Sequence, residues 1–548
     1  MKKQCLSSTV FLTVCLALCQ ARAAGPVAPA SRQVVIEKRY LNLPVKNGGQ
    51  MGRMSVSVDG RKVRVFDIQL TDGPPDFWAF IDAGAWQGKT ATIAIDKLPG
   101  GSHGLEAIDQ SDQIKQSDTL YKEKLRPQFH FSPKRGWTND PNGMVYHDGQ
   151  WHLFFQHNPY GWGWGNMHWG HAVSKDLVHW EELPIALYPW TMAKDHCFSG
   201  SATIDADNTS GFQTGGEKVM VAAFTDTGCG EAIAYSNDAG LTWTYWKNNP
   251  VVRHNGRDPY IFWYAPGRHW VMALYDGADG DHLAIYTSND LKQWKFESKL
   301  PGYYECTNLF ELPLDGNKND TRWVAFGGNA EYAVGRFDGR QFTPEQQGKR
   351  QVHYGNFYAS QVFNNAPDGR KIQIGWARID MPGMPFNQMM SVPYELSLRT
   401  TGDGIRMFAQ PVAELKKLRS KGITKEKSTI EPGKPLEVSV GSQLLDVSVT
   451  FAVDKAKGFS IVIFGREVRY DAVAKTLDSV PLQPIDGKLR LRFLVDRSSL
   501  EICGNDGRIA ITRPFAPVEK DFTLQCKADG DTVWLDHLEV YELKSIWE

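Results

Sequence analysis

The stretch SKDLVHW at residues 174–180 indicates the fold, because its pattern returns twice further along the chain. SNDAGLTW at residues 236–243 and SNDLKQW at residues 288–294 have the same Ser-x-Asp turn followed by a tryptophan. Each stretch separates two apolar strand patterns, at a spacing of roughly 50–60 residues that fits one four-stranded propeller blade. Chance recurrence of turn residues is the alternative, and three tryptophans at matching positions disfavour it. The sequence therefore predicts an all-β chain whose residues 125–405 form a five-bladed β-propeller.

Strand patterns on both sides of this region predict two further β domains. Residues 33–116 alternate and predict a small N-terminal β domain, in which FWAFI at 77–81 is typical of a buried strand and the polar stretch 100–116 of a linker. A helical linker at 406–424, with Leu415 and Leu418 on one face, would lead to a C-terminal β-sandwich at 425–548. In that domain alternation predicts opposite faces for Leu491, Phe493 and Val495 and for Arg490, Arg492 and Leu494.

The N-terminus has the features of a secretory signal peptide. Lys2 and Lys3 precede a short apolar segment, and small residues precede the cleavage site expected after Ala23. An Ala/Pro-rich linker at 24–32 would follow. Lipid attachment at Cys19 is the less favoured alternative, because Leu18 fits a lipoprotein signal poorly. The sequence predicts a secreted or periplasmic protein without a transmembrane segment.

The composition of the chain limits the classes of molecule that it is expected to bind. The chain has 61 basic and 62 acidic side chains, for a net charge of -1, which gives no electrostatic basis for binding nucleic acid. Aromatic content is 12%, including 18 tryptophans, which suits either sugar stacking or a β-rich core. Nothing in the composition fixes an oligomeric state.

Cysteine and histidine spacing predicts neither a disulfide framework nor a metal site. Five cysteines would remain after cleavage, and Cys503–Cys526 is the pair considered for a bridge. His168, His171 and His179 lie among aromatic residues without zinc-site spacing, so we expect core or supporting histidines.

Three acids stand in unusual settings, one in each of successive repeats: Asp140 in WTNDPNG, Asp258 in RDP and Glu305 in YEC. The inner strands of a propeller converge on an axial funnel, so we expect these acids to meet. Glycoside hydrolysis needs two carboxyl groups with different proton affinities. The amides next to Asp140 and the guanidinium next to Asp258 predict ionised carboxylates, whereas the less polar neighbours of Glu305 predict a retained proton.

An ordered set of motifs resembles glycoside hydrolase family 32, the invertases, inulinases and levanases. It runs from about residue 125 to the C-terminus and comprises WTNDPNG (137–143), HLFFQ (152–156), WGNMHWGHA (164–172), FSGSA (198–202), RDP (257–259), EC (305–306), FYA (357–359), IGW (374–376) and VDRSSLE (495–501). The resemblance implies a five-bladed propeller followed by a sandwich. It also implies a retaining β-fructosidase that releases terminal fructose from levan, inulin or sucrose without a metal or organic cofactor.

The resemblance also implies roles for individual residues. Asp140 would be the nucleophile, Asp258 the transition-state stabiliser and Glu305 the acid/base. The residues implied in substrate binding are Asn139, Asn142, Gln156, Trp164, Phe198, Ser199, Arg257 and Trp376. Asn356 departs from the pattern, because many relatives have an acidic residue just before Phe-Tyr-Ala.

Two other classes of function stay open at this point: an arabinan- or xylan-acting propeller hydrolase, and a non-catalytic glycan-binding propeller. The Asn-Asp-Pro-Asn and Glu-Cys contexts disfavour the first, and the presence of all three acids disfavours the second. The sequence leaves open the β-2,1 or β-2,6 linkage preference, exo or endo action, and the balance of hydrolysis and transfer. It also leaves open whether the N-terminal domain binds sugar, docks to the propeller or forms oligomer contacts, and structural support is the favoured interpretation.

Overall fold

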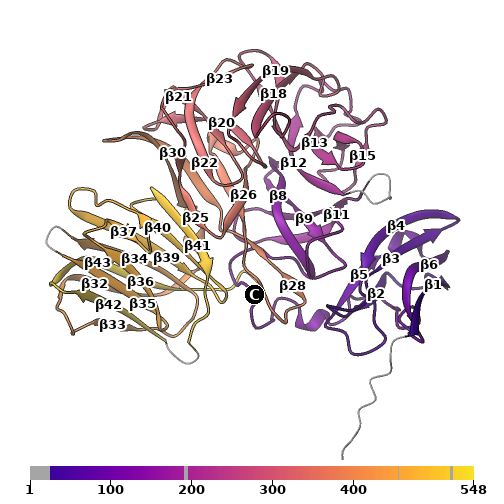
Figure 1. Cartoon of the computed structure of the whole chain (residues 1–548), viewed down its shortest axis with the longest axis horizontal. Coiled ribbons are helices and arrows are strands. Elements are labelled where there is room, and N and C mark those ends of the chain that lie inside the picture. The colour runs from indigo at the N-terminus through magenta and orange to yellow at the C-terminus, as the bar shows by residue number, and fades with distance from the viewer. Residues whose placement is uncertain (1–24, 190–195, 454–455, 519–521, 548) are drawn as a thin grey trace, which may run out of the picture.

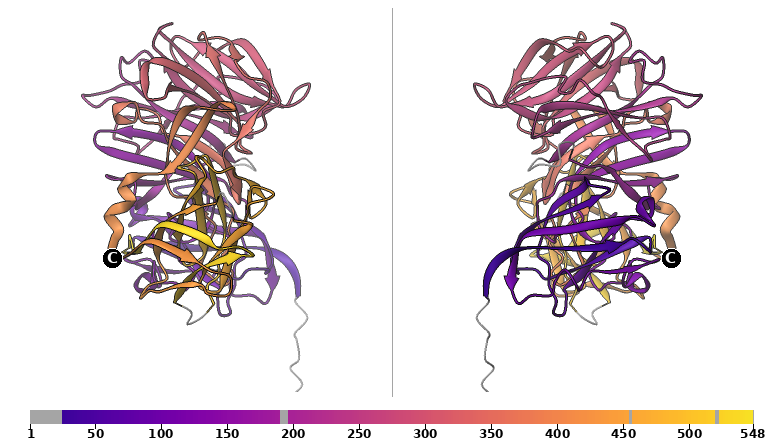
Figure 2. Two further views of the ribbon diagram at one scale, coloured as in Figure 1. Left: turned by 90° about the vertical axis from the view of Figure 1, so that its left-hand side faces the viewer. Right: turned by 90° about the vertical axis from the view of Figure 1, so that its right-hand side faces the viewer.

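The computed structural model describes residues 25–189, 196–453, 456–518 and 522–547, and these residues are built almost entirely from β-strands (Figure 1). The all-β prediction is therefore confirmed. The predicted signal peptide lies outside the described residues. Among the described residues, no helix is long and apolar enough to span a membrane. The N-terminal domain and the C-terminal sandwich lie against the same side of the propeller, on either side of β28 (Figures 1 and 2).

The N-terminal domain consists of two small antiparallel sheets, ordered β1-β6-β3-β4 and β5-β2-β7, around one apolar core. Its strands are β1 (Gly25–Val35), β2 (Tyr40–Val45), β3 (Gly52–Val58), β4 (Arg61–Ile68), β5 (Phe77–Asp82), β6 (Thr90–Gly100) and β7 (Asp109–Ser111). In β5, Phe77, Ala79 and Ile81 are buried while Trp78 and Phe80 keep exposed surface. The prediction of a fully buried strand at 77–81 was wrong, because this sheet covers the core with one face only.

Two segments predicted as linkers belong to these sheets. Strand β1 (Gly25–Val35) covers the described part of the linker predicted at 24–32, and its main chain pairs with β6 in a register that includes Ser31 opposite Ala94. Its prolines are tolerated because β1 is an edge strand with irregular register. In the polar stretch 100–116, β7 pairs with β2. Main-chain pairing at a sheet edge does not need an apolar sequence, so composition misidentified both segments.

The propeller is assembled from consecutive antiparallel meanders. The first meander contains β8 (Gly136–His147), β9 (Gln150–Asn158), β10 (His168–Ser174) and β11 (Glu181–Leu187). The second contains β12 (Cys197–Asp205), β13 (Val219–Asp226), β14 (Gly230–Ser236) and β15 (Thr244–Tyr245). The third contains β16 (Gly256–Tyr264), β17 (His269–Asp276), β18 (His282–Ser288) and β19 (Lys295–Pro301). The remaining strands are β20 (Asn308–Leu314), β21 (Asn317–Phe326), β22 (Glu331–Phe337), β23 (Phe342–Pro344), β24 (Arg350–Gln351), β26 (Phe357–Val362), β27 (Ile372–Ala377), β28 (Phe386–Asn387), β29 (Met389–Met390), β30 (Tyr394–Thr401) and β31 (Gly404–Pro411).

The ring closes where β28 pairs with β8 in parallel. A parallel bridge between Leu314 and Leu398 joins the last two meanders, β20–β23 and β26–β31, into one sheet. The number of five blades therefore stays a prediction, although the propeller itself is present.

The sequence repeat has a structural basis in a carboxylate-closed turn. Strands β10, β14 and β18, the third in their meanders, end at the repeat serines. Asp176 accepts the main-chain N–H groups of residues 178 and 179, and Asp290 those of residues 292 and 293. Asp338 closes the same turn after β22 by accepting from residues 340 and 341. This fourth copy lacks the serine and tryptophan, so the sequence pattern did not reveal it.

The C-terminal domain is a sandwich of two sheets. One sheet contains β25 (His353–Gly355), β32 (Arg419–Ile430), β34 (Leu445–Ala452), β39 (Lys488–Val495), β40 (Ser499–Gly504), β41 (Ile509–Pro514) and β43 (Val533–Leu543), and the other β33 (Leu436–Ser439), β35 (Gly458–Ile463), β36 (Arg466–Asp471), β37 (Thr476–Leu477), β38 (Val480–Pro481) and β42 (Thr523–Asp529). Leu491, Phe493 and Val495 enter the sandwich core, whereas Leu494 joins the propeller's apolar cluster, which confirms the predicted two-faced strand. Strand β25 comes from the propeller and pairs with β41 in parallel, so one sheet bridges the domains.

The predicted helical linker at 406–424 is mostly strand. Only the 3-10 helix Ala413–Leu418 is helical, and there Leu415 and Leu418 are buried as predicted. Strands β31 and β32 occupy the rest of the range, because their main chains pair with β30 and β43. Cys503 and Cys526 are both free thiols in different sheets, so the bridge considered between them is not formed.

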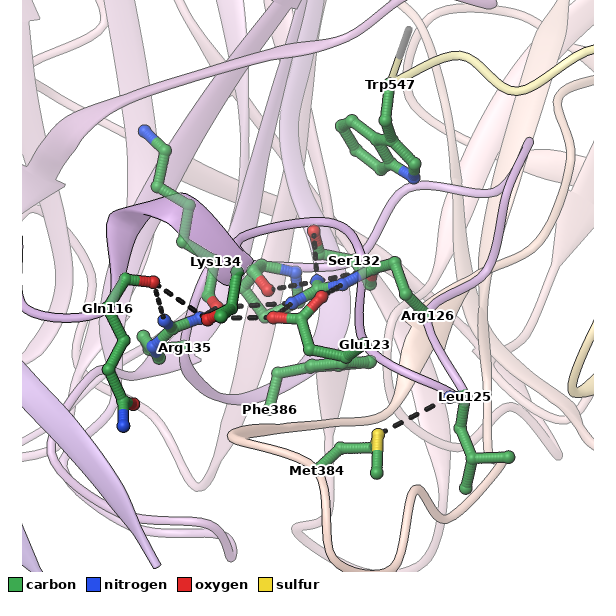
Figure 3. Close-up of polar contacts among 12 residues, drawn as sticks. Gln116, Glu123, Leu125, Arg126, Ser132, Lys134, Arg135, Met384, Phe386 and Trp547 are labelled. Atoms are coloured by element: carbon green, nitrogen blue, oxygen red, sulfur yellow. Dashed lines mark hydrogen bonds and ion pairs between the residues drawn. The ribbon is translucent and has the colours of Figure 1, made fainter.

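Buried charges fasten the junctions between domains. Glu123 lies between the guanidinium groups of Arg126 and Arg135, at 2.8 and 3.2 Å, where the chain enters the propeller (Figure 3). The guanidinium carbon of Arg126 lies 3.4 Å from the ring centroid of Phe386 in β28. Tyr121 stacks on Trp547 near the C-terminus with ring centroids 4.0 Å apart. These contacts connect the entry of the propeller to its closing strand and to the end of the sandwich.

A second junction surrounds His130. The Asp496 carboxylate accepts the main-chain N–H groups of Gln128 and Phe129 and lies 2.8 Å from His130 Nδ1, while Glu501 lies 3.4 Å from Nε2. Burial opposes a charge on this imidazole, but the two carboxylates outweigh it and raise the pKa of His130 to about 9.

This pKa predicts that stability depends on pH. The pKa of His130 is higher in the folded chain than in the unfolded chain, so its contribution is fully present below pH ~6.5 and is lost as pH rises through ~9. The loss should be on the order of 3 kcal/mol. Thermal unfolding measured between pH 6 and 10 should show the melting temperature of the wild type falling towards that of His130→Gln. A constant difference between the two proteins across this range would contradict the assignment.

Candidate functional site

The inner strands of the propeller bring five polar side chains to one place. Asp140 lies on β8, Ser199 on β12, Asp258 on β16 and Tyr358 on β26, and Glu305 lies in the segment just before β20. Contacts that run through Cys306 and Arg257 connect all five. Residues far apart in the sequence thus form one continuous polar cluster.

Local irregularities in the backbone aim these side chains. The register shifts between residues 138 and 141 in β8, 197 and 200 in β12, 257 and 260 in β16, and 358 and 361 in β26. Asp258, Glu305 and Cys306 have φ angles of 66°, 48° and 42°, in the left-handed region that residues with a Cβ rarely adopt. Bulges and left-handed residues redirect side chains and concentrate at functional sites. The sheet is therefore interrupted where the acids point inward.

Asp140 is held by three donors. One carboxylate oxygen accepts from Asn139 Nδ2 at 3.0 Å, and the other accepts from Ser199 Oγ at 2.6 Å and from Cys306 Sγ at 3.5 Å. The carboxyl lies deep in the site although the residue keeps some exposed surface. Burial outweighs the donors, and the pKa of Asp140 is raised, with the Glu305 charge adding to the shift. Of the two flanking amides predicted as donors, Asn139 donates to Asp140 and lowers its pKa as expected, whereas Asn142 bonds to other partners.

Asp258 is the most deeply buried acid of the three. It is 4% exposed, its main-chain N–H donates to Thr225 Oγ1 at 2.9 Å, and its carboxylate accepts from the Cys306 main-chain N–H at 3.0 Å. Burial, followed by repulsion from Asp140, raises the pKa of Asp258 to about 8. Arg257 Nε lies 3.8 Å away, too far to compensate. The predicted ionised state of Asp258 was therefore wrong for neutral pH.

Glu305 meets polar partners from two other strands. Its carboxylate forms an ion pair with Arg257 and accepts from the Tyr358 hydroxyl at 2.7 Å. The sequence neighbours Tyr304 and Cys306 suggested a less polar setting, which was wrong because the tertiary neighbours supply a cation and a hydroxyl. Arg257 therefore connects Asp258 with Glu305. Its predicted place among the site residues agrees with these contacts.

Cys306 joins the acids at their centre. Its Sγ lies 3.5 Å from Asp140 and 3.6 Å from Asp258, and its main chain donates to Asp258. Burial and the surrounding carboxylates raise the pKa of this thiol well above its usual value, so it remains an S–H donor. Cys306 and Tyr358 are contacts that we did not predict, although both lie in the quoted EC and FYA motifs.

Two predicted binding residues are buried supports of the site. Gln156 is 1% exposed and donates to the Cys197 main-chain oxygen at 2.9 Å. With its amide oxygen turned towards Gln156, Asn142 accepts from Gln156 Nε2 at 2.8 Å and donates to Ser199 Oγ at 3.3 Å. These amides fasten β8 to β9 and β12, and so fix the strand that carries Asp140.

Aromatic residues stand at the edges of the cluster. Trp164, 57% exposed, lies edge-on to Phe198 with ring centroids 6.1 Å apart. Trp376 lies edge-on to Trp137 and to Tyr358, at 5.9 and 6.3 Å. Phe198 directly precedes Ser199, and Tyr358 bonds Glu305, so both aromatic pairs are connected to the acids. At the departure from the family pattern, Asn356 donates to the Arg378 main-chain oxygen at 2.7 Å, a bond that a carboxylate could not make.

Of the three histidines predicted as core or supporting residues, His168 and His171 lie in the core and His179 lies at the surface. Burial lowers the pKa of His168 to about 3, and it lowers the pKa of His171, which faces His152 at 3.1 Å, well below the usual value. His179 is half-exposed and bonds to Asp176 in the repeat turn. Within the described ranges, no three His, Cys, Asp or Glu side chains are grouped so that they could hold a metal ion.

The chain is similar to known proteins from the propeller to the C-terminal sandwich. Residues 130–411 match the glycosyl hydrolases family 32 N-terminal domain, and residues 414–542 match the family 32 C-terminal domain. The chain is 39% identical to the levanase of Bacillus subtilis over 78% of this chain and 72% of that protein. The crystal structure of exo-inulinase from Aspergillus awamori superposes with a TM-score of 0.71 at 31% identity, covering 78% of this chain and 100% of that one. The β-fructofuranosidase of Schwanniomyces occidentalis complexed with fructosyl-erythritol gives a TM-score of 0.70 at 28% identity, with coverage of 78% and 100%.

The raised pKa of Asp258 predicts a conflict between stability and activity. Between pH ~4 and ~8 the unfolded chain ionises this carboxyl while the folded chain keeps it neutral, so the free energy of unfolding decreases as pH rises. Asp258→Asn removes this effect and keeps an oxygen that can accept from Cys306. We expect the variant to melt at a higher temperature than the wild type at pH 7.5, with an equal or smaller difference at pH 4, and to lose turnover. A variant that is less stable than the wild type at pH 7.5 would contradict this account.

Proposed function

Because the chain belongs to glycosyl hydrolase family 32 and is a glycosidase of the β-fructosidase type, we propose that Asp140, Asp258 and Glu305 form its catalytic centre. The observation that carries the proposal is the continuous set of contacts from Ser199 through Asp140, Cys306, Asp258 and Arg257 to Glu305. It brings three acids together, and two of them can supply the pair of carboxyl groups that hydrolysis of a glycosidic bond requires.

In the proposed reaction, Asp140 attacks the anomeric carbon of a terminal fructosyl unit. A carboxylate–carbon bond forms while the bond to the leaving oxygen breaks, and Glu305 gives its proton to that oxygen. Water then attacks the same carbon and transfers a proton to Glu305. This second displacement breaks the bond between the Asp140 carboxylate and the anomeric carbon and releases fructose. Two displacements give retention of configuration. Ser199 and Asn139, which donate to Asp140, orient the attacking carboxylate.

Asp258 acts as a hydrogen-bonding partner for the hydroxyls of the fructosyl ring. Its buried carboxyl is fixed by the Cys306 main chain, so little reorganisation is needed when positive charge develops at the anomeric carbon. Arg257 lies close to both Asp258 and Glu305, and its positive charge reduces the repulsion between these two acids. Tyr358 orients Glu305 through the hydroxyl bond.

The substrates proposed are fructans and sucrose, with levan or inulin as the polymer. Levanases, an exo-inulinase and invertases are among the similar proteins, which supports this range. Trp164, Phe198 and Trp376 would contact sugar faces, and Asn142 and Gln156 would support the pocket. We also propose export, through the signal peptide predicted at 1–23 or, less favoured, by lipid attachment at Cys19. Hydrolysis of arabinan or xylan, or sugar binding without hydrolysis, would favour the alternative functions instead.

Substitutions of the two reacting acids test the mechanism. Asp140→Asn should reduce kcat on sucrose by at least ~10³-fold, because the nucleophile is lost. Glu305→Gln should slow natural substrates strongly and an activated aryl fructoside far less, because a good leaving group needs no proton. Asp338→Asn, in an exposed repeat turn, is the matched control and should keep wild-type kinetics. Substantial turnover by Asp140→Asn in a folded protein would refute the assignment.

Product analysis tests the mode of action. Exo attack on inulin and levan should give fructose alone at early times, and the fructose should appear first as the β anomer if configuration is retained. A ladder of oligosaccharides would indicate endo attack instead. The ratio of kcat/KM on the two polymers would assign the linkage preference. Chromatography of early products and NMR of the newly released sugar provide these measurements.

A further inference from the structure

The loop that carries Trp164 is tied by its own asparagine. We call residues 158–167 the tryptophan loop. Asn158 Oδ1 accepts from the main-chain N–H of Tyr160 at 3.1 Å and from Asn166 Nδ2 at 3.0 Å, and Asn158 Nδ2 donates to the Gly163 main-chain oxygen at 2.8 Å. One buried amide therefore gathers both arms of the loop beneath its tip.

The tip itself has little internal support. Trp164 stands between Gly163 and Gly165, and Gly165 has a φ of 149°. Glycine fixes the backbone less than any other residue. The indole is 57% exposed and makes ring contacts with His196 and Phe198 at centroid distances of 5.5 and 6.1 Å. Its position next to Phe198, which directly precedes Ser199, therefore depends on how firmly the two arms are held.

The N-terminal domain holds both arms through strand β4. On the first arm, Phe66 stacks on Tyr160 with ring centroids 3.6 Å apart and planes at 19°. On the second arm, the Asn166 side chain makes a reciprocal pair of 2.7 Å bonds with the main-chain N–H and oxygen of Asp67. Tyr160 is 1% exposed and belongs to the apolar core of the N-terminal domain. Two adjacent residues of β4 thus fasten the loop on either side of Trp164.

Further contacts make this docking rigid. The guanidinium carbon of Arg64 lies 3.7 Å from the ring centroid of Tyr188, whose ring lies edge-on to His168, just beyond the loop. On the opposite side, Trp162 Nε1 donates to the Phe386 main-chain oxygen at 3.1 Å, which ties the loop to β28. The loop is therefore clamped between the closing strand of the propeller and the N-terminal domain.

We infer that the N-terminal domain is a positioning element of the sugar-binding site, and that Phe66 sets substrate affinity through Trp164. Both matched family domains lie after residue 130, so this domain lies outside them. The inference rests on the proposed function, in which Trp164 contacts the fructosyl substrate. Phe66 lies in another domain and acts only through the loop, so it is a positioning residue.

A double-mutant cycle on the full-length chain tests the inference, with sucrose and inulin as substrates. Phe66→Ala should raise KM about 3- to 10-fold with kcat nearly unchanged, because a binding contact equal in ground and transition states is lost. Trp164→Ala should raise KM at least as much. The double variant should match Trp164→Ala alone, since Phe66 has no effect once the indole is absent. Phe66→Leu keeps most of the apolar volume but lacks the stacked ring, so it should show a smaller rise in KM. This variant replaces Phe66→Ala in the test if Phe66→Ala does not fold.

Ile93→Ala is the matched control. It removes apolar volume from the same core in β6, which pairs with β1 and β3, and should lower the melting temperature without changing KM. Wild-type KM in both Phe66 variants, together with a raised KM in Trp164→Ala, would overturn the inference and leave the proposed function standing. Unchanged kinetics in Trp164→Ala would overturn the proposed role of the indole. Additive effects in the double variant, or an equal KM rise in Ile93→Ala, would show that Phe66 acts by general stability.

Discussion

The whole site depends on keeping three carboxyl groups close together inside a protein that offers them one guanidinium. Asp140 and Asp258 both approach Cys306 Sγ, and Arg257 reaches both Asp258 and Glu305. Burial and mutual repulsion raise the pKa values of both aspartates, so the cluster retains a proton near neutral pH. Perturbed pKa values of this kind concentrate at functional sites, and the folded chain is destabilised by them.

The scaffold tolerates this repulsion because its domains are fastened to each other by buried ion pairs. Asp496 and Glu501 enclose a protonated His130 between propeller and sandwich, and Glu123 neutralises two guanidinium groups where the chain enters the propeller. Strand β25, from the propeller part of the chain, pairs with β41 and so joins a sheet of the sandwich. These contacts therefore fix the propeller, which carries the three acids, to the sandwich.

The N-terminal domain adds a third fastening, at the loop proposed to contact substrate. Phe66 and the main chain of Asp67 hold the two arms of this loop, whose exposed tryptophan lies edge-on to Phe198. Contacts of this kind can change substrate affinity without touching substrate. They also give a functional reason for a domain that neither matched family domain includes.

The sequence by itself determined the features that depend on local pattern: strand alternation, as in Leu491, Phe493 and Val495, the Ser-x-Asp turns, and the motifs that mark Asp140, Asp258 and Glu305. It failed where partners come from distant strands. The ionisation of Asp258 follows from burial beside Asp140, and the surroundings of Glu305 come from Arg257 and Tyr358, not from residues 304 and 306. It also misread β1, because main-chain pairing with β6 leaves no signature in composition. Only the tertiary structure decided these points, since desolvation, charge repulsion and sheet pairing depend on distances that sequence order does not contain.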